Sequence, residues 1–261
     1  KFESNRQCGS SMEVMQRIAQ AIMLGQYECG LCLGVERMER GLSWPIQSST
    51  RITKINPELF RHHNETQAKQ AKTHRDYFNT DIPEQILKSP PLCIMPQTAQ
   101  NVADMYRLER QECDEFSLHS HQKYGSSFKN GFYQNEIVPL TIQKPVFKED
   151  GQCDYTKIGE ETTLTVDEGY RHDASIEKLA ALNAIPGLQS YTGNSIIQTA
   201  GNSCPTNDGV SVCLLMSAKK AKALGIKPIA KIVSMNVSGI KPQIMGMGPV
   251  IAVKKALKQA E

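Results

Sequence analysis

Residues 5–35 read NRQCGSSMEVMQRIAQAIMLGQYECGLCLGV, and they predict a helix followed directly by a strand. Across residues 10–24 the apolar side chains recur at helical spacing, and Gly25 is a natural stop for that helix. Residues 27–35 predict a strand buried on both faces, because the apolar residues alternate with small residues rather than with charges. A helix followed by a buried strand indicates an α/β layered core.

The alternation of helices and strands resumes later in the chain. Residues 41–91 interrupt it with several prolines and a polar helical run at 64–74, so we expect an excursion from the core there. The hydrophobic patterns predict helices at 98–106, 109–123, 175–182, 218–224 and 250–260, and strands at 136–142, 162–166, 209–216 and 229–237.

Composition excludes several classes of protein. The chain has 261 residues, enough to bury a core without disulfide staples. Its 30 Lys and Arg against 27 Asp and Glu leave a net charge of +3, which does not invite nucleic acid binding. We expect no membrane span, because no window of about 18 apolar residues occurs. Eight scattered cysteines favour a reducing compartment.

Two groups of metal-ligating residue types are assigned structural roles. Cys29 and Cys32 form a C-x-x-C pair, but no second pair or suitably spaced histidine follows. His119 and His121 stand two apart on a predicted helix, which does not aim two imidazoles at one ion. The sequence therefore predicts no metal site.

Cys8 is a candidate nucleophile, because it lies at the start of the first predicted helix. There the exposed backbone N–H groups and the helix dipole stabilise a thiolate. Ser10 is predicted to cap the helix, with Glu13 three residues later as its capping-box partner. The alternative is a small buried cysteine.

Residues 5–11, NRQCGSS, resemble the nucleophile motif of thiolases, the enzymes that cleave or form 3-ketoacyl-CoA. The shared order of many further segments carries the resemblance, which covers nearly the whole chain except about residues 41–91. These segments are GVERM at 34–38, TAQNVA at 98–103, ERQECDEFSLHSHQK at 109–123, EIVP at 136–139, DEGYR at 167–171, TAGN at 199–202 and IMGMGP at 244–249.

The resemblance implies a layered αβαβα thiolase fold with an inserted loop domain, of which this chain would form only the central part. Residues 1–40 would belong to the N-terminal core, residues 41–207 to the loop domain with its excursion at 41–91, and residues 208–261 to the returning core and a linker toward a C-terminal half. Missing strands would leave sheet edges and apolar surface exposed. The implied assembly is a homodimer or a dimer of dimers.

The resemblance also implies the chemistry. The cysteine at the Cys8 position takes an acyl group from a CoA thioester, and CoA then removes it. CoA and 3-ketoacyl-CoA are therefore the expected substrates, and no resident cofactor is expected. Arg171 is implied near the adenine and phosphate portion of CoA, where a guanidinium can pair with anionic oxygens.

Three further positions are implied along the pantetheine arm of CoA. Met95 matches a lining methionine, although core packing is the slightly preferred alternative. Cys204 stands where relatives have a serine that hydrogen-bonds the arm, so a thiol replaces a stronger hydroxyl partner. Ser203 is the neighbouring hydroxyl that would compensate.

The family also uses a histidine, an asparagine and a second cysteine from C-terminal motifs, and the chain contains none of those motifs. Without the general base and the oxyanion partners, this chain alone is expected to be a weak or inactive catalyst. For the complete protein we expect thiolysis of 3-ketoacyl-CoA in fatty-acid degradation. The alternatives are a biosynthetic acetoacetyl-CoA thiolase and a non-catalytic acyl-CoA-binding or scaffold protein. The peroxisome or the mitochondrial matrix is favoured over the cytoplasm.

Overall fold

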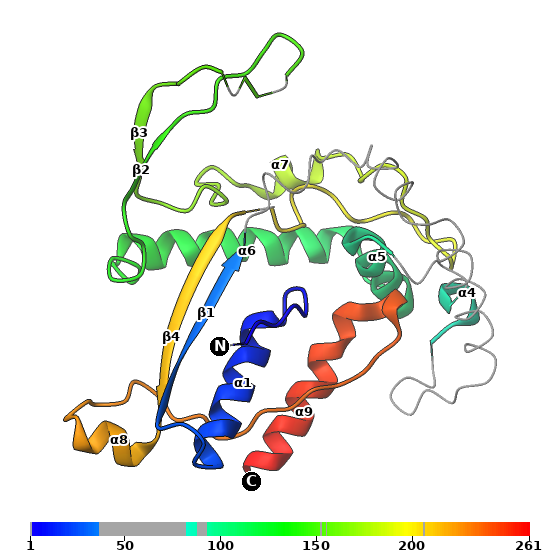
Figure 1. Cartoon of the computed structure of the whole chain (residues 1–261). Helices are drawn as coiled ribbons and strands as arrows, with labels where there is room; N and C mark the ends of the chain where they lie inside the picture. Colours follow the sequence, from blue (N-terminus) through cyan, green and yellow to red (C-terminus); the bar gives the residue numbers. More distant parts are fainter. Residues whose placement is uncertain (1, 37–81, 88–92, 152, 155, 206) are drawn as a thin grey trace. The chain divides into compact units, whose positions relative to one another are not determined.

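The computed structural model describes residues 2–36, 82–87, 93–151, 153–154, 156–205 and 207–261 (Figure 1). The chain divides into two compact units. Unit 1 combines Lys1–Met105 with Thr206–Glu261, and unit 2 is Tyr106–Pro205. The helical run expected at 64–74 lies outside the described residues, and the predicted domain limits at 40/41 and 207/208 stay predictions.

Unit 1 begins with the predicted first helix, α1 (Ser10–Met23). Ile18 and Ala21 are buried along one side of it. The helix ends where Gly25 adopts a left-handed φ of +74°, a conformation that glycine tolerates without a steric cost. The Gln26 N–H then donates to the Ala21 carbonyl at 2.9 Å, which closes the last turn.

The strand that follows, β1 (Cys29–Glu36), pairs antiparallel with β4 (Gly209–Met216). The side chain of α1 residue Ile18 lies so close to Gly30 that a Cβ there would collide with it, and Ser11 approaches Gly34 in the same way. The two glycines share one face of β1, since side-chain positions alternate along a strand. That face is therefore the one that packs against α1.

The expectation that β1 is buried on both faces is wrong. The small residues of β1 face α1, while large apolar residues at alternate positions of both strands lie on the opposite face and are 54–71% exposed. The small residues that alternate along β1 do not indicate a second buried face. They leave room for α1 to pack closely against one face of the strand. The expected exposure of apolar surface is confirmed, by Leu31, Leu33, Val35, Val210, Val212 and Leu214.

The other helices among the described residues of unit 1 are α4 (Glu84–Leu87), α5 (Met95–Tyr106), α8 (Ala218–Ala223), the 3-10 helix η1 (Pro242–Met247) and α9 (Gly248–Ala260). A buried amide joins α5 to η1, because Asn101 Nδ2 donates to the Gln243 carbonyl at 2.8 Å. Gly225 follows α8 with a left-handed φ of +67°, a conformation that commonly ends a helix.

The strand expected at 229–237 does not form. A strand needs a neighbouring edge for its backbone groups. This segment instead makes side-chain contacts with α9: Ser234 Oγ donates to the Ala256 carbonyl at 2.7 Å, and Asn236 Nδ2 donates to Gln259 Oε1 at 3.2 Å. Its apolar alternation predicted a ladder that the described residues do not provide.

Unit 2 is built on the long helix α6 (Arg110–Lys129). It also contains an antiparallel pair, β2 (Leu140–Gln143) and β3 (Glu161–Leu164), and the short helix α7 (Ile176–Ala180). The strand expected from residue 136 begins only at Leu140, because the N–H groups of Glu136 and Ile137 both donate to the Tyr133 carbonyl and close a turn. Within the described residues no helix is long and apolar enough to cross a membrane.

Candidate functional site

Cys8 is exposed and lies one residue before Gly9, the N-cap of α1. Ser10 fixes the loop around it: its Oγ accepts from the Arg6 N–H at 2.8 Å and donates to the Gln7 carbonyl at 2.6 Å. Gln7 has a left-handed φ of +50°, which costs a residue with a side chain about 1 kcal/mol. The loop thus holds the thiol outward at the end of the helix, where backbone N–H groups favour negative charge.

The predicted capping box does not form. Gly9 takes the N-cap position, and the Glu13 carboxylate instead pairs with Arg17 at 2.6 Å and with Arg6 at 3.1 Å. The Arg17 hydrogen bond, aided by the charges of both arginines and opposed by desolvation, lowers the pKa of Glu13. Two guanidinium groups outweighed the N-cap pairing that sequence spacing suggested.

Met95, also in unit 1, is the first residue of α5. Its side chain is 52% exposed, which contradicts the core-packing alternative. Its carbonyl accepts from Thr98 Oγ1 at 2.8 Å and so fixes the first turn. A soft side chain on a fixed backbone suits contact with a flexible ligand arm, and the CoA contact itself stays a prediction.

Cys29 and Cys32 stand three residues apart on β1, so they point to opposite faces. Cys32 is 4% exposed, and burial, followed by the neighbouring Cys213, raises the pKa of its thiol. The pair cannot converge on one ion. In the described part of the chain no group of three His, Cys, Asp or Glu side chains is arranged to hold a metal.

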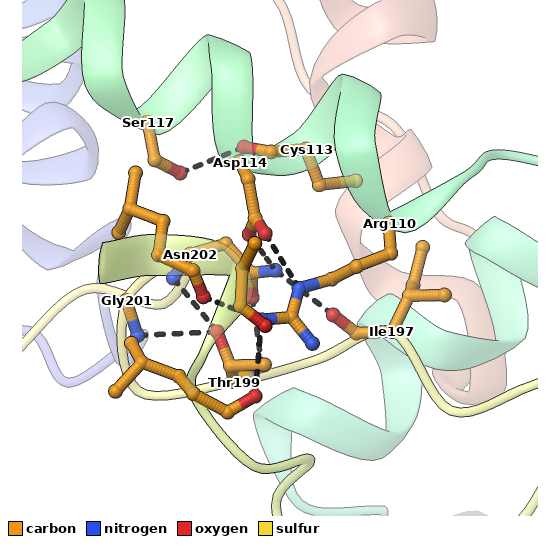
Figure 2. A network of polar contacts seen from close by, with 11 residues as sticks. Arg110, Cys113, Asp114, Ser117, Ile197, Thr199, Gly201 and Asn202 are labelled. Atoms are coloured by element: carbon orange, nitrogen blue, oxygen red, sulfur yellow. Dashed lines mark hydrogen bonds and ion pairs between the residues drawn. The ribbon is translucent and has the colours of Figure 1, made fainter. Parts of the chain in front are cut away.

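In unit 2 a buried carboxylate organises the TAGN segment, residues 199–202 (Figure 2). Asp114 is 1% exposed, and it pairs with Arg110 Nε at 2.7 Å and accepts from Asn202 Nδ2 at 3.1 Å. Asn202 Oδ1 in turn accepts from the Thr199 N–H at 2.8 Å, and Thr199 Oγ1 accepts from the Gly201 N–H at 3.2 Å. The network gives the loop one fixed shape.

The predicted residues Ser203 and Cys204 follow this loop directly. Ser203 is half-buried and Cys204 is exposed. Pro205 then lies against Gly169, where a Cβ would come within 3.3 Å of the proline ring. The structure therefore brings the end of the TAGN loop beside the turn that carries Arg171.

Arg171 is exposed at a surface cleft of 350 Å³ in unit 2. Among the described residues, the lining includes two cations and two imidazoles and no carboxylate, an arrangement that suits an anionic ligand. The Arg171 N–H donates to His121 Nδ1 at 3.2 Å, and this hydrogen bond fixes the backbone of the arginine at the cleft. The ionisable lining residues are His121, Lys129, Arg171 and His172.

Sequence reasoning did not select Arg110, Asp114 or Tyr124, and it considered His121 only as a metal ligand and assigned it a structural role. The signal for the first two was their i, i+4 spacing on a predicted helix, which allows an ion pair but says nothing of burial. The signal for the other two was a shared helix face. Neither pattern reveals which loops pack against these helix residues.

Known proteins resemble the chain over nearly its whole length. The family model for the thiolase N-terminal domain matches residues 2–219. The chain is 36% identical over 257 residues to a 3-ketoacyl-CoA thiolase of Marinomonas sp., and 33% identical over 260 residues to a beta-ketoadipyl-CoA thiolase of Pseudomonas aeruginosa. Each alignment covers 98% of this chain, and 53% and 56% of the respective relative.

Solved structures give the same result. The acetyl-CoA acetyltransferase of Syntrophomonas wolfei is similar with a TM-score of 0.66 at 28% identity, over 97% of this chain and 54% of that one. The human mitochondrial 3-ketoacyl-CoA thiolase is similar with a TM-score of 0.65 at 27% identity, over 98% and 56%. The chain therefore has the thiolase fold, and it spans about half the length of the relatives it matches.

Proposed function

The chain belongs to the thiolase family, and from this premise we propose that the protein carrying it transfers acyl groups between CoA thioesters through Cys8. The observation that carries the proposal is an exposed thiol, held by a fixed loop at a helix N-terminus, inside the segment that the family model matches. An exposed thiol at this position is accessible to an acyl donor, and cysteine is a strong nucleophile in acyl transfer.

The proposed step conserves atoms and charge. The Cys8 sulfur bonds to the acyl carbon as the bond from that carbon to its leaving group breaks, and the leaving group departs with the electron pair and takes up a proton. The CoA thiol then gives up its proton, which balances the one taken up by the leaving group. The CoA sulfur bonds to the acyl carbon, and Cys8 departs as a thiolate. The covalent intermediate divides one difficult transfer into two easier steps.

We assign the cleft at Arg171 to the phosphate-bearing part of CoA. A guanidinium beside Lys129 and His172 offers several donors to anionic oxygens, and the lining holds no carboxylate to repel them. Ser203, Cys204 and Met95 are proposed to contact the pantetheine arm, since two of the three side chains are exposed and the Ser203 hydroxyl is half-buried.

Acyl trapping tests the central claim. The protein is incubated with a 3-ketoacyl-CoA without free CoA, and intact mass spectrometry then measures covalent acylation. The unchanged protein and Cys29→Ser, which replaces another exposed cysteine, should gain one acyl group, whereas Cys8→Ser should gain none. Acylation of Cys8→Ser to the same extent would overturn the assignment. CoA binding without acylation in any variant would support a non-catalytic acyl-CoA-binding protein. The thiol of Cys204, a weaker hydrogen-bond partner than a serine hydroxyl, favours this alternative.

The direction and the substrate of the reaction are a finer proposal. We propose degradative thiolysis of 3-ketoacyl-CoA in fatty-acid breakdown. The name of the Marinomonas relative, a 3-ketoacyl-CoA thiolase, supports the substrate. Activity confined to acetoacetyl-CoA would favour the biosynthetic reading. Preference for a substrate with a terminal carboxylate would favour the chemistry named for the Pseudomonas relative. Rates against these three acyl chains separate the possibilities.

Assembly and location complete the proposal. The exposed apolar face of β1 and β4 supports a homodimer or a dimer of dimers, because such a face is normally covered in a soluble assembly. The described cysteines form no disulfide, which supports a reducing compartment, and we propose the peroxisome or the mitochondrial matrix.

A further inference from the structure

The turn that carries Arg171, residues 167–171, is attached to α6 at both of its ends. At the first end, Tyr124 Oη donates to Asp167 Oδ2 at 2.9 Å and accepts from the Asp167 N–H at 3.4 Å. At the second end, His121 Nδ1 accepts from the Arg171 N–H at 3.2 Å. The turn therefore depends on a helix that lies more than forty residues earlier in the chain.

The middle of the turn rests on a helix position that admits no side chain. Tyr170 lies over Gly125, and its hydroxyl occupies the space that a Cβ would take. The Tyr170 ring also packs against Tyr124, with centroids 5.0 Å apart, and against His121 at 6.3 Å. These contacts restrict the backbone next to Arg171.

His121, Tyr124 and Gly125 thus lie on the face of α6 that contacts the turn at 167–171. Positions 121, 124 and 125 stand at i, i+3 and i+4, which places them side by side on a helix. His121, Gly125, Tyr170 and Arg171 all line the cleft described above. We call His121, Tyr124 and Gly125 the α6 cradle.

We propose that the α6 cradle positions Arg171 for the anionic part of CoA, with His121 as the positioning residue that fixes the arginine backbone. The inference rests on the proposed function of the Arg171 cleft. His121 acts through Arg171. The Arg171 carbonyl is fixed as well, because it accepts from the Ala174 N–H at 3.2 Å. A long flexible side chain gains most when its backbone is already fixed, since less freedom is then lost on binding.

The acceptor role of His121 defines its test. A neutral imidazole that accepts at Nδ1 carries its proton on Nε2. Asparagine can place an amide oxygen near the Nδ1 position, whereas leucine fills a similar volume without an acceptor. His121→Asn should therefore preserve the contact with the Arg171 N–H, and His121→Leu should abolish it.

The readout is the preference for CoA over pantetheine as acyl acceptor. It is measured on the full-length protein as kcat/KM for CoA divided by kcat/KM for pantetheine. Pantetheine lacks the nucleotide and its phosphates, so damage unrelated to their recognition lowers both values and leaves the ratio unchanged. His121→Leu should lower the ratio about three- to tenfold, mainly through KM for CoA, and His121→Asn should stay within about twofold of the unchanged protein.

Arg171→Gln separates the inference from the function on which it rests. If this variant leaves the ratio unchanged, the proposed role of Arg171 fails. If it lowers the ratio while His121→Leu does not, the cradle inference fails and the CoA cleft stands. In the double variant His121→Leu should add nothing to the loss caused by Arg171→Gln, and an additive loss would show that His121 acts independently.

Hydrogen exchange gives a readout without catalysis. Amide exchange in a peptide spanning residues 167–174 should accelerate in His121→Leu and stay slow in His121→Asn, because only the second keeps an acceptor for the Arg171 N–H. Equal exchange in all three proteins would overturn the claim that His121 fixes this backbone.

Discussion

The loop around Cys8 and the TAGN loop at 199–202 are both fixed by hydrogen bonds, but these bonds span very different distances along the chain. Ser10 secures the Cys8 loop through Arg6 and Gln7, within four residues. The TAGN loop is secured by Asp114, which lies 88 residues before Asn202. The first loop can form wherever α1 forms, whereas the second requires α6 to be folded and in place.

The largest effect is expected at the long-range end of this comparison. Asp114→Ala should lower the free energy of unfolding by about 3 kcal/mol, because it leaves Arg110 and the Asn202 amide without their buried partner. Urea denaturation measures the change. The neighbouring Glu115→Ala is the control, since that side chain is exposed and its loss should cost within about 0.5 kcal/mol. Equal losses at both positions would contradict the central role of the network.

The second prediction concerns how α1, and with it the Cys8 loop, is placed on the sheet. Gly30→Ala should destabilise by about 2 kcal/mol, because the new methyl group would overlap Ile18, a buried and stiff β-branched residue. Gly209→Ala, on the paired strand, is the matched control, because a Cβ there meets open space. Denaturation of both variants checks the difference. If Gly30→Ala is as stable as its control, α1 does not pack as closely as the structure shows.

The short-range end of the comparison should respond less. Ser10→Ala removes one acceptor and one donor from the Cys8 loop, and we expect a loss of about 1 kcal/mol. The exposed neighbour Ser11 provides the control variant Ser11→Ala. Alkylation of Cys8, followed by peptide mass spectrometry, then reports whether the loop itself has changed. A larger loss than that of Asp114→Ala would reverse the order of the two loops.

The same contrast explains what could be predicted from the sequence. Helices α1, α8 and α9 and strand β4 follow from local periodicity, so the predicted bounds lie within two residues of those observed, whereas α6 extends six residues beyond its predicted end. The strand expected at 229–237 failed because strand formation depends on a partner edge that local pattern does not encode. The two-sided burial of β1 failed because small residues can mean either a buried strand or room for a helix.

The candidate site divides in the same way. The placement of Cys8 before α1 follows from sequence, as a helix start is a local signal. The Asp114 network and the α6 cradle do not, because their residues carry ordinary helix spacing and acquire a role only through loops that arrive much later in the chain. Glu13 shows that even a local signal can fail: its predicted partner was the N-cap, and two arginines took it instead.

The smallest expected effect is the contribution of Glu13 itself, and it depends on pH. The Arg17 hydrogen bond and the two nearby guanidinium charges lower the pKa of Glu13 in the folded protein below its ordinary value of 4.5. A carboxyl group whose pKa falls on folding adds stability above its unfolded pKa and loses it as the pH drops through the folded one. The difference in unfolding free energy between the unchanged protein and Glu13→Gln should therefore be positive at neutral pH and should vanish in acid. Added salt should shrink it at neutral pH, because these side chains are partly exposed to screening. A difference that stayed constant from neutral to acid pH would mean that packing, rather than the ion pairs, fixes the first turn of α1, and the Cys8 loop would then owe nothing to the arginines beside it.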